Sequence, residues 1–303
     1  MTTNTWHRGT ATEITPGMSV SEQLETAGLN WRVEKTPAYY RTADGMKESP
    51  VFAAYRDDTG AFFDIYSKRE PWQNADIVEA FNRFCDQADL PMTHLGALEE
   101  GRMLYAAAQL PEMIAPAQSL NDLTQGYLLL EDSHANGHGL RVSIYANRLV
   151  CLNGMKIPVR VGTQIIAHLG EFNSDRVERI LAAARTTLIQ EKQQMTELAD
   201  VSISKAEAAM QLIKAFGDPQ LPVDEQPRMV KTALRLFDGG GKGSTELSAY
   251  NTAYGLLQSV TEYFNHHAVK RGSVAEQFHS VLSGSRANNM QKFQRQVVGC
   301  YLR

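Results

Sequence analysis

A change in hydrophobic pattern near residue 173 most restricts the folds open to this chain. Before that point, apolar residues come in short runs bounded by Gly, Asp and Asn, as is typical of β-strands. After it, they recur at the 3.6-residue period of amphipathic helices. Strands gathered in one half and helices in the other predict an α+β fold, because a doubly wound parallel sheet needs the two to alternate.

Short apolar segments and turn residues mark the elements before residue 173. The predicted strands cover residues 31–41, 50–56, 61–67, 93–98, 102–110, 126–131, 140–146 and 148–152. Two helices are predicted, at residues 20–27 and 74–87, and Asp58-Thr59-Gly60 predicts a hairpin turn. Residues 132–139 predict a surface turn in which His134 and His138 would be exposed to solvent.

Helix signals dominate the rest of the chain. They predict helices at about residues 174–200, 205–216, 228–237 and 246–267 and a last helical region after residue 273. The pairs with capping-box spacing are Ser19 and Glu22, Ser204 and Glu207, and Ser273 and Glu276. The helix over 246–267 would bury one face made of Leu247, Tyr250, Tyr254, Leu257 and Phe264. We therefore expect a strand-rich α+β core over residues 1–172 and a helical region over 173–303.

The Gly-rich segment 239–244 is interpreted as a flexible connector between helices. A phosphate-binding P-loop would need glycine where Leu236 stands, and Ser or Thr where Gly243 follows Lys242. The spacing therefore argues against nucleotide binding. Contact between Lys242 and a phosphate of a backbone stays open as the alternative to a plain hinge.

Several classes of protein are disfavoured by composition. The N-terminus has no apolar stretch behind a basic start, so a signal peptide is not predicted, and the apolar runs are too short to span a membrane. Cys85, Cys151 and Cys300 are widely spaced, which disfavours a disulfide framework or a structural zinc site. We expect a protein of the cytoplasm of a bacterium or of an infected bacterium, with no bound cofactor.

Charge is unevenly distributed along the chain. Residues 201–303 hold 12 Lys and Arg against 8 Asp and Glu, a balance of +4, so residues 1–200 carry −8 of the total of −4. Cations for a phosphate backbone and aromatic rings for bases are what single-stranded nucleic acid needs. The predicted nucleic-acid-binding residues are Arg141, Arg148, Lys156, Arg160, Lys242, Arg271, Arg286, Lys292 and Arg295, and the candidate aromatics are Tyr39, Tyr40, Tyr55 and Tyr66. The competing interpretations are a solvated basic helix surface and tyrosines that only pack.

Two groups of residues could hold a metal ion, and each has a simpler explanation. Glu262 and His266 are four residues apart on one predicted helix, but a histidine at a helix C-terminus is favourable without metal. Asp57, Asp58 and Asp64 are close in sequence, but the first two suit the Asp-Thr-Gly turn. We assign no catalytic residue and no metal ligand.

A set of ordered motifs resembles a phage- and plasmid-borne family, domain of unknown function 932, which includes prophage proteins of the YafZ and YfjQ type. The motifs are Ala27-Gly28-Leu29-Asn30-Trp31-Arg32-Val33-Glu34, Tyr55-Arg56-Asp57-Asp58-Thr59-Gly60, Tyr127-Leu128-Leu129-Leu130, Arg148-Leu149-Val150-Cys151-Leu152-Asn153, Asn251-Thr252-Ala253-Tyr254-Gly255 and Val260-Thr261-Glu262-Tyr263, followed by His266. The resemblance covers roughly residues 6–298 and marks Asn153, Asn251, Tyr254, Glu262 and His266 as family positions. Gly154, Ala167-His168-Leu169 and Asn265 depart from the family pattern.

The resemblance implies a role on mobile elements. By distant analogy, the strand-rich half is similar to the single-strand annealing proteins of the Redβ and Rad-fifty-two-like group, which run a DNA strand along a basic groove. The preferred hypothesis is a non-enzymatic accessory protein that binds single-stranded DNA, can promote annealing or recombination, and works as a homo-oligomer. The alternatives are a module that binds a host or phage protein, and a metal-dependent nuclease that uses Glu262 and His266.

Overall fold

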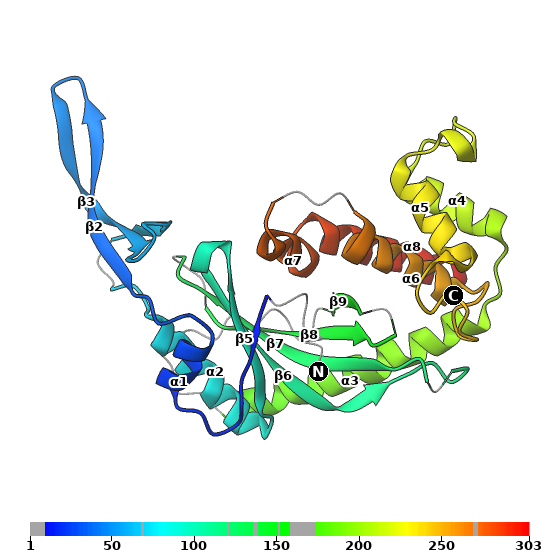
Figure 1. Ribbon diagram of the computed structural model, residues 1–303, viewed down its shortest axis with the longest axis horizontal. Coiled ribbons are helices and arrows are strands. Elements are labelled where there is room, and N and C mark those ends of the chain that lie inside the picture. The colour runs from blue at the N-terminus through cyan, green and yellow to red at the C-terminus, as the bar shows by residue number, and fades with distance from the viewer. Residues whose placement is uncertain are drawn as a thin grey trace.

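The computed structural model confirms the α+β fold, with a strand-rich first half and a helical second half (Figure 1). It describes residues 10–67, 70–119, 121–135, 139–150, 152–157, 174–268 and 272–302. The residues His138, Cys151, Arg160 and Arg271 lie outside these ranges, as do Ala167-His168-Leu169 and the side chain of Lys156. Among the helices of the described ranges, none combines the length and the apolar character needed to cross a membrane.

An antiparallel sheet of six strands forms the centre of the molecule. Its strands, in the order in which they pair, are β1 (Thr12–Glu13), β5 (Met92–Leu98), β6 (Met103–Ile114), β7 (Thr124–Ser133), β8 (Arg141–Arg148) and β9 (Asn153–Ile157). From β5 to β9 each strand pairs with the next one along the chain. The strand predicted at residues 148–152 is wrong, because residues 149 and 150 form the turn between β8 and β9. The apolar Leu149 and Val150 that suggested a strand are partly exposed at this turn.

A second, three-stranded sheet extends away from the body as an arm (Figure 1). Its strands are β2 (Val33–Thr42), β3 (Gly45–Arg56) and β4 (Phe62–Tyr66). The predicted turn at residues 58–60 is confirmed between β3 and β4. Strand β4 pairs only with residues 52–55 of β3, so the far end of the β2–β3 hairpin is a two-stranded ribbon.

The helices follow the sequence signals closely in most places. They are α1 (Val20–Thr26), α2 (Asn74–Ala88), α3 (Ser174–Asp200), α4 (Lys205–Phe216), α5 (Arg228–Arg235), α6 (Ala253–Glu262), α7 (Val274–Leu282) and α8 (Ser285–Tyr301). The three predicted capping boxes are confirmed at the starts of α1, α4 and α7. Each box lowers the pKa of its glutamate, because the carboxylate accepts hydrogen bonds from the capping serine.

The prediction of one long helix over residues 246–267 is wrong about where the helix begins. Residues 244–251 are turns, α6 begins at Ala253, and a wider π-helical turn over Tyr263–His267 follows it. Leu247 and Tyr250, which were expected to face the core, are 78% and 58% exposed. Helical periodicity alone could not show that the chain turns at Asn251, where φ is +52°.

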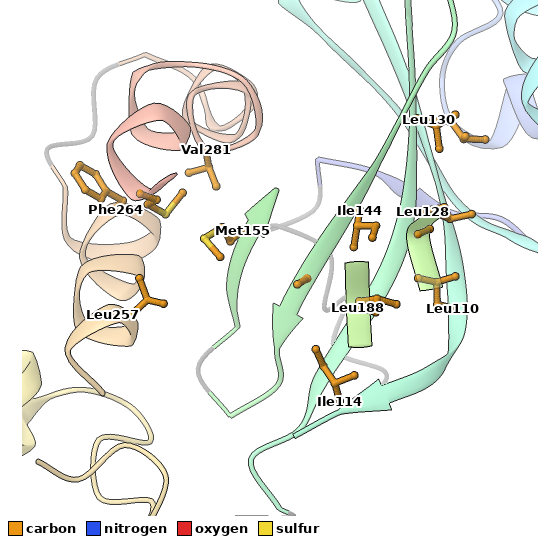
Figure 2. Close-up of a cluster of buried hydrophobic side chains, with 14 of the residues drawn as sticks. Leu110, Ile114, Leu128, Leu130, Ile144, Met155, Leu188, Leu257, Phe264 and Val281 are labelled. Carbon is orange, nitrogen blue, oxygen red and sulfur yellow. The ribbon is translucent and has the colours of Figure 1, made fainter. Parts of the chain in front are cut away.

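One large hydrophobic cluster joins the two halves of the chain. It combines Leu128 and Ile144 of the sheet with Leu188 of α3 and Leu257 of α6 (Figure 2). Helices α2 and α3 contact this face of the sheet, while Phe278 and Leu282 of α7 pack with tyrosines of the other face. This cluster therefore spans the boundary at residue 172 between the strand-rich half and the helical half.

His134 corrects the prediction of an exposed turn at residues 132–139. Its ring is fully buried, stacks on Phe63 with centroids 5.2 Å apart, and lies 2.8 Å through Nε2 from Oδ1 of Asn74. The hydroxyl of Tyr66 donates to its backbone oxygen. The arm, α2 and the end of β7 are therefore held together around this imidazole.

The packing of α2 yields a test of the fold. Burial raises the pKa of the Cys85 thiol to about 12, so only about one molecule in ten thousand carries the reactive thiolate at pH 8. Cys300, in contrast, is exposed on α8. We expect a maleimide to modify Cys300 in the folded protein and to reach Cys85 only after denaturation, as followed by peptide mass spectrometry. Rapid labelling of native Cys85 would contradict this packing.

Candidate functional site

A buried ion pair ties the sheet to the helical half. At the end of β8, the guanidinium of Arg148 donates through Nε and Nη2 to both carboxylate oxygens of Asp122, at 2.6 and 2.8 Å. Both side chains are at least 97% buried. The hydroxyl of Ser248 also donates to Asp122, and Nη2 of Arg148 donates to the backbone oxygen of Gly243. We call this group, with Tyr254 whose ring lies 5.5 Å from the guanidinium, the polar junction.

Glu262 holds the Gly-rich connector from the other side. Its buried carboxylate accepts from the backbone N–H of Lys242, at 3.0 and 3.2 Å. The amide of Gly241 donates to the backbone oxygen of Leu236, and the amide of Ser244 donates to that of Gly241. These three amides are therefore used inside the protein, which is unlike a loop that cradles phosphate with its backbone. The side chain of Lys242 is exposed.

Two asparagines connect β9 to the helices. Nδ2 of Asn153 donates to the backbone oxygen of Gln258 in α6 at 3.5 Å. Asn265 pairs with the backbone of Gly154 in both directions, since Nδ2 donates to its oxygen and Oδ1 accepts from its N–H. Gly154 and Asn265, two of the three places at which the sequence departs from the pattern of the family it resembles, thus contact each other. Their role here is to join a strand edge to a helix end.

The motif at residues 251–255 builds the entry to α6. Asn251 adopts a left-handed conformation, and its backbone oxygen accepts from the N–H of Ile203. Thr252 caps the helix by accepting from the N–H of Gly255 at 3.0 Å. A Cβ atom on Gly255 would lie 1.8 Å from the backbone oxygen of Ala249, so only glycine fits. The motif is explained by a tight turn.

Glu262 and His266, which the sequence offered as an alternative metal-binding pair, do not form a metal site with a third ligand among the described residues. The imidazole nearest to the Glu262 carboxylate belongs to His267, at 3.6 Å. His266 lies half-buried in the π-helical turn. Within the described ranges, no three His, Cys, Asp or Glu side chains gather closely enough to hold a metal ion.

Asp57 and Asp58, which follow β3, stabilise the hairpin turn, as the Asp-Thr-Gly pattern in the sequence suggested. Oδ1 of Asp57 accepts from the backbone N–H of Arg32 at 2.9 Å. Asp58 pairs with Arg56 at 2.6 Å, and this pairing lowers the pKa of its carboxyl group. The two carboxylates therefore stabilise the turn.

The predicted basic residues are spread over several parts of the molecule. Arg141 lines a cavity of about 150 Å³ together with Glu131, Asp132 and His279, and these carboxylates disfavour phosphate there. Nη1 of Arg286 donates to the backbone oxygen of Phe264 at 3.2 Å. With Arg148 buried in the polar junction, these three guanidiniums are not available as a joint basic surface.

Lys292 and Arg295 do lie together, one helical turn apart on the exposed side of α8. The opposite side of this helix is buried through Ala287, Met290, Phe293 and Val297. This spacing directs positions 292 and 295 towards solvent, and both side chains are exposed. We call the pair the α8 face. Neither side chain forms an ion pair within the part of the chain that the structure describes.

Comparison with known proteins places the chain in a family context. A family model described as domain of unknown function (DUF932) matches residues 65–296, which include the polar junction and the α8 face. Neither curated proteins nor solved structures give a significant match.

Breaking the buried ion pair of the polar junction is expected to lower the stability of the fold strongly. Arg148→Ala or Asp122→Ala leaves a buried charge without its partner and is expected to cost about 3–5 kcal/mol in free energy of unfolding. The double variant Arg148→Met with Asp122→Leu should lose clearly less than the sum of the two single changes. As a control, Lys205→Ala breaks the exposed pair with Asp238 and should cost under ~1 kcal/mol. Urea unfolding measures all four; equal losses in the buried and exposed pairs would contradict the assignment.

Proposed function

The chain belongs to the DUF932 family, and from that premise we propose that it is a non-enzymatic accessory protein of a phage or plasmid that binds single-stranded DNA. The proposal includes promotion of strand annealing or recombination, action as a homo-oligomer, and a place in the bacterial or infected cytoplasm. It requires no covalent step, because annealing needs a strand to be held by its backbone while its bases stay accessible.

The observation that supports DNA binding is the α8 face. Lys292 and Arg295 are exposed, adjacent and of one sign, which is the arrangement that a phosphate backbone attracts. The helix also lies in the most basic part of the chain: from residue 270 to 303 there are six Lys and Arg against the single acid Glu276. A polyanion would therefore approach the helical half.

The acidity of the first 200 residues limits where the strand can run. Their balance of −8 repels phosphate from the body of the strand-rich half. Lys242 adds one exposed cation on the connector, which the polar junction holds in place. The proposed contact is therefore limited to a few phosphates, so binding should be moderate and strongly weakened by salt.

A salt titration with a labelled single-stranded oligonucleotide tests the proposal. Replacing both Lys292 and Arg295 with Ala removes two phosphate contacts and should flatten the slope of log affinity against log salt by about 1.4. Affinity should fall roughly 25-fold at 0.1 M salt. The matched control Arg185→Ala with Lys192→Ala removes two exposed cations from α3 and should leave both quantities close to wild type.

Three results are distinguishable in this experiment. A large loss only in the α8 variant supports the proposal. Equal losses in both double variants indicate general charge attraction without a site. Absence of binding by the wild-type protein even at low salt overturns the nucleic-acid proposal and favours the protein-interaction alternative.

A further inference from the structure

The tip of the arm, residues 39–48, exposes large side chains that nothing in the described structure covers. Tyr39 and Met46 are 57% and 64% exposed, and Tyr40 is 51% exposed. A bulge between Pro37 and Tyr39 separates this tip from the three-stranded part of the arm. A two-stranded ribbon is only marginally stable alone in water. Its exposed apolar side chains indicate a surface that another molecule contacts.

One face of the tip carries four side chains in a square. Tyr39 lies opposite Glu48, and Arg41 lies opposite Met46. Residues directly opposite in an antiparallel pair share a face, as do residues two apart on one strand. The apolar pair Tyr39 and Met46 therefore occupies one diagonal of the square. The charged pair Arg41 and Glu48 occupies the other.

The charges of the tip favour a protein partner over a nucleic acid. Residues 39–48 contain two cations, Arg41 and Lys47, and two anions, Asp44 and Glu48. A surface of zero net charge does not attract a polyanion. Among the described residues, neither Arg41 nor Glu48 has an ion-pair partner within its own chain, and both are exposed.

We propose that this face binds the same face of a second copy of the chain. The pattern is self-complementary about a two-fold axis along the apolar diagonal. Rotation about that axis places Tyr39 against Tyr39 and Met46 against Met46 of the second copy. It also places Arg41 against Glu48 of the second copy, and this contact occurs twice. Such an isologous contact closes at two subunits.

The opposite face of the tip is not self-complementary, so a mutation on that face can serve as a control. It carries Tyr40 and Lys47 opposite each other, with a positive charge and no acid in the pair. A second copy would bring Lys47 against a like charge or against an uncharged ring. The square of Tyr39, Arg41, Met46 and Glu48 is therefore the face that two copies can share.

The proposed contact between two tips is small, so the method must be able to detect a weak dimer. Two hairpin tips bury less than the roughly 1,200 Å² of a standard stable interface, so this contact alone gives a weak dimer. Sedimentation velocity over a wide range of protein concentration detects such an equilibrium. The inference concerns the oligomeric part of the proposed function and does not depend on DNA binding.

Charge reversal at the tip tests the pairing directly. Arg41→Glu and Glu48→Arg each create like-charge contacts and should raise the dimer dissociation constant about tenfold or more. The double variant restores opposite charges with their places exchanged and should return dimerisation close to wild type. Lys47→Glu makes the same change as Arg41→Glu on the opposite face and should leave dimerisation unchanged.

Three outcomes would overturn the proposed self-contact. Failure of the double variant to recover dimerisation excludes pairing between Arg41 and Glu48 of two copies. A strictly monomeric wild-type protein at high concentration excludes the self-contact, even where the oligonucleotide still binds through the α8 face. Weaker oligonucleotide binding by Arg41→Glu, with no change in association, would assign the tip to nucleic acid instead. Unchanged thermal unfolding of each variant confirms that all of them fold.

Discussion

The buried ion pair between Arg148 and Asp122 is the interaction on which the arrangement of the two halves depends. Two charges out of water cost several kcal/mol each unless their remaining donors and acceptors are satisfied. Here the pair is bidentate, Ser248 donates to the carboxylate, and Gly243 accepts from the guanidinium. Each of these partners comes from a different segment of the chain. The requirement to satisfy the pair therefore fixes the end of β8 against the connector and the turn before α6.

Local signals predicted the helices well because their causes are local. A serine and a glutamate three residues apart determine where α4 begins, and both were visible in the sequence. The candidate site was predictable only as a list of residue types. Arg148 and Lys292 look alike in sequence, yet one is 2% exposed and the other lies in solvent. The difference depends on Asp122, which stands 26 residues away from Arg148 and becomes its partner only when β7 and β8 pair.

The tyrosines of the arm show the same limit for strands. A tyrosine in a strand packs when another layer covers its face, and the sequence does not reveal where that layer ends. Tyr66 meets the body and is buried, whereas Tyr39 lies on the part of the hairpin that β4 does not reach and is exposed. The prediction for His134 was wrong in the opposite direction. The sequence suggested an exposed turn, but the arm and α2 cover this residue.

The family positions and the exposed surfaces have separate roles in this chain. Asn153 and Glu262 hydrogen-bond to backbone groups, of α6 and of the Gly-rich connector respectively. Asn251 forms the turn before α6, and Tyr254 contacts Arg148 in the polar junction. The two surfaces used in the proposals, the α8 face and the tip of the arm, contain none of these four positions. The family match from residue 65 to 296 includes the α8 face but not the hairpin of β2 and β3. The proposed DNA contact through α8 therefore lies inside the matched region, and the proposed self-contact through the tip of the arm lies outside it.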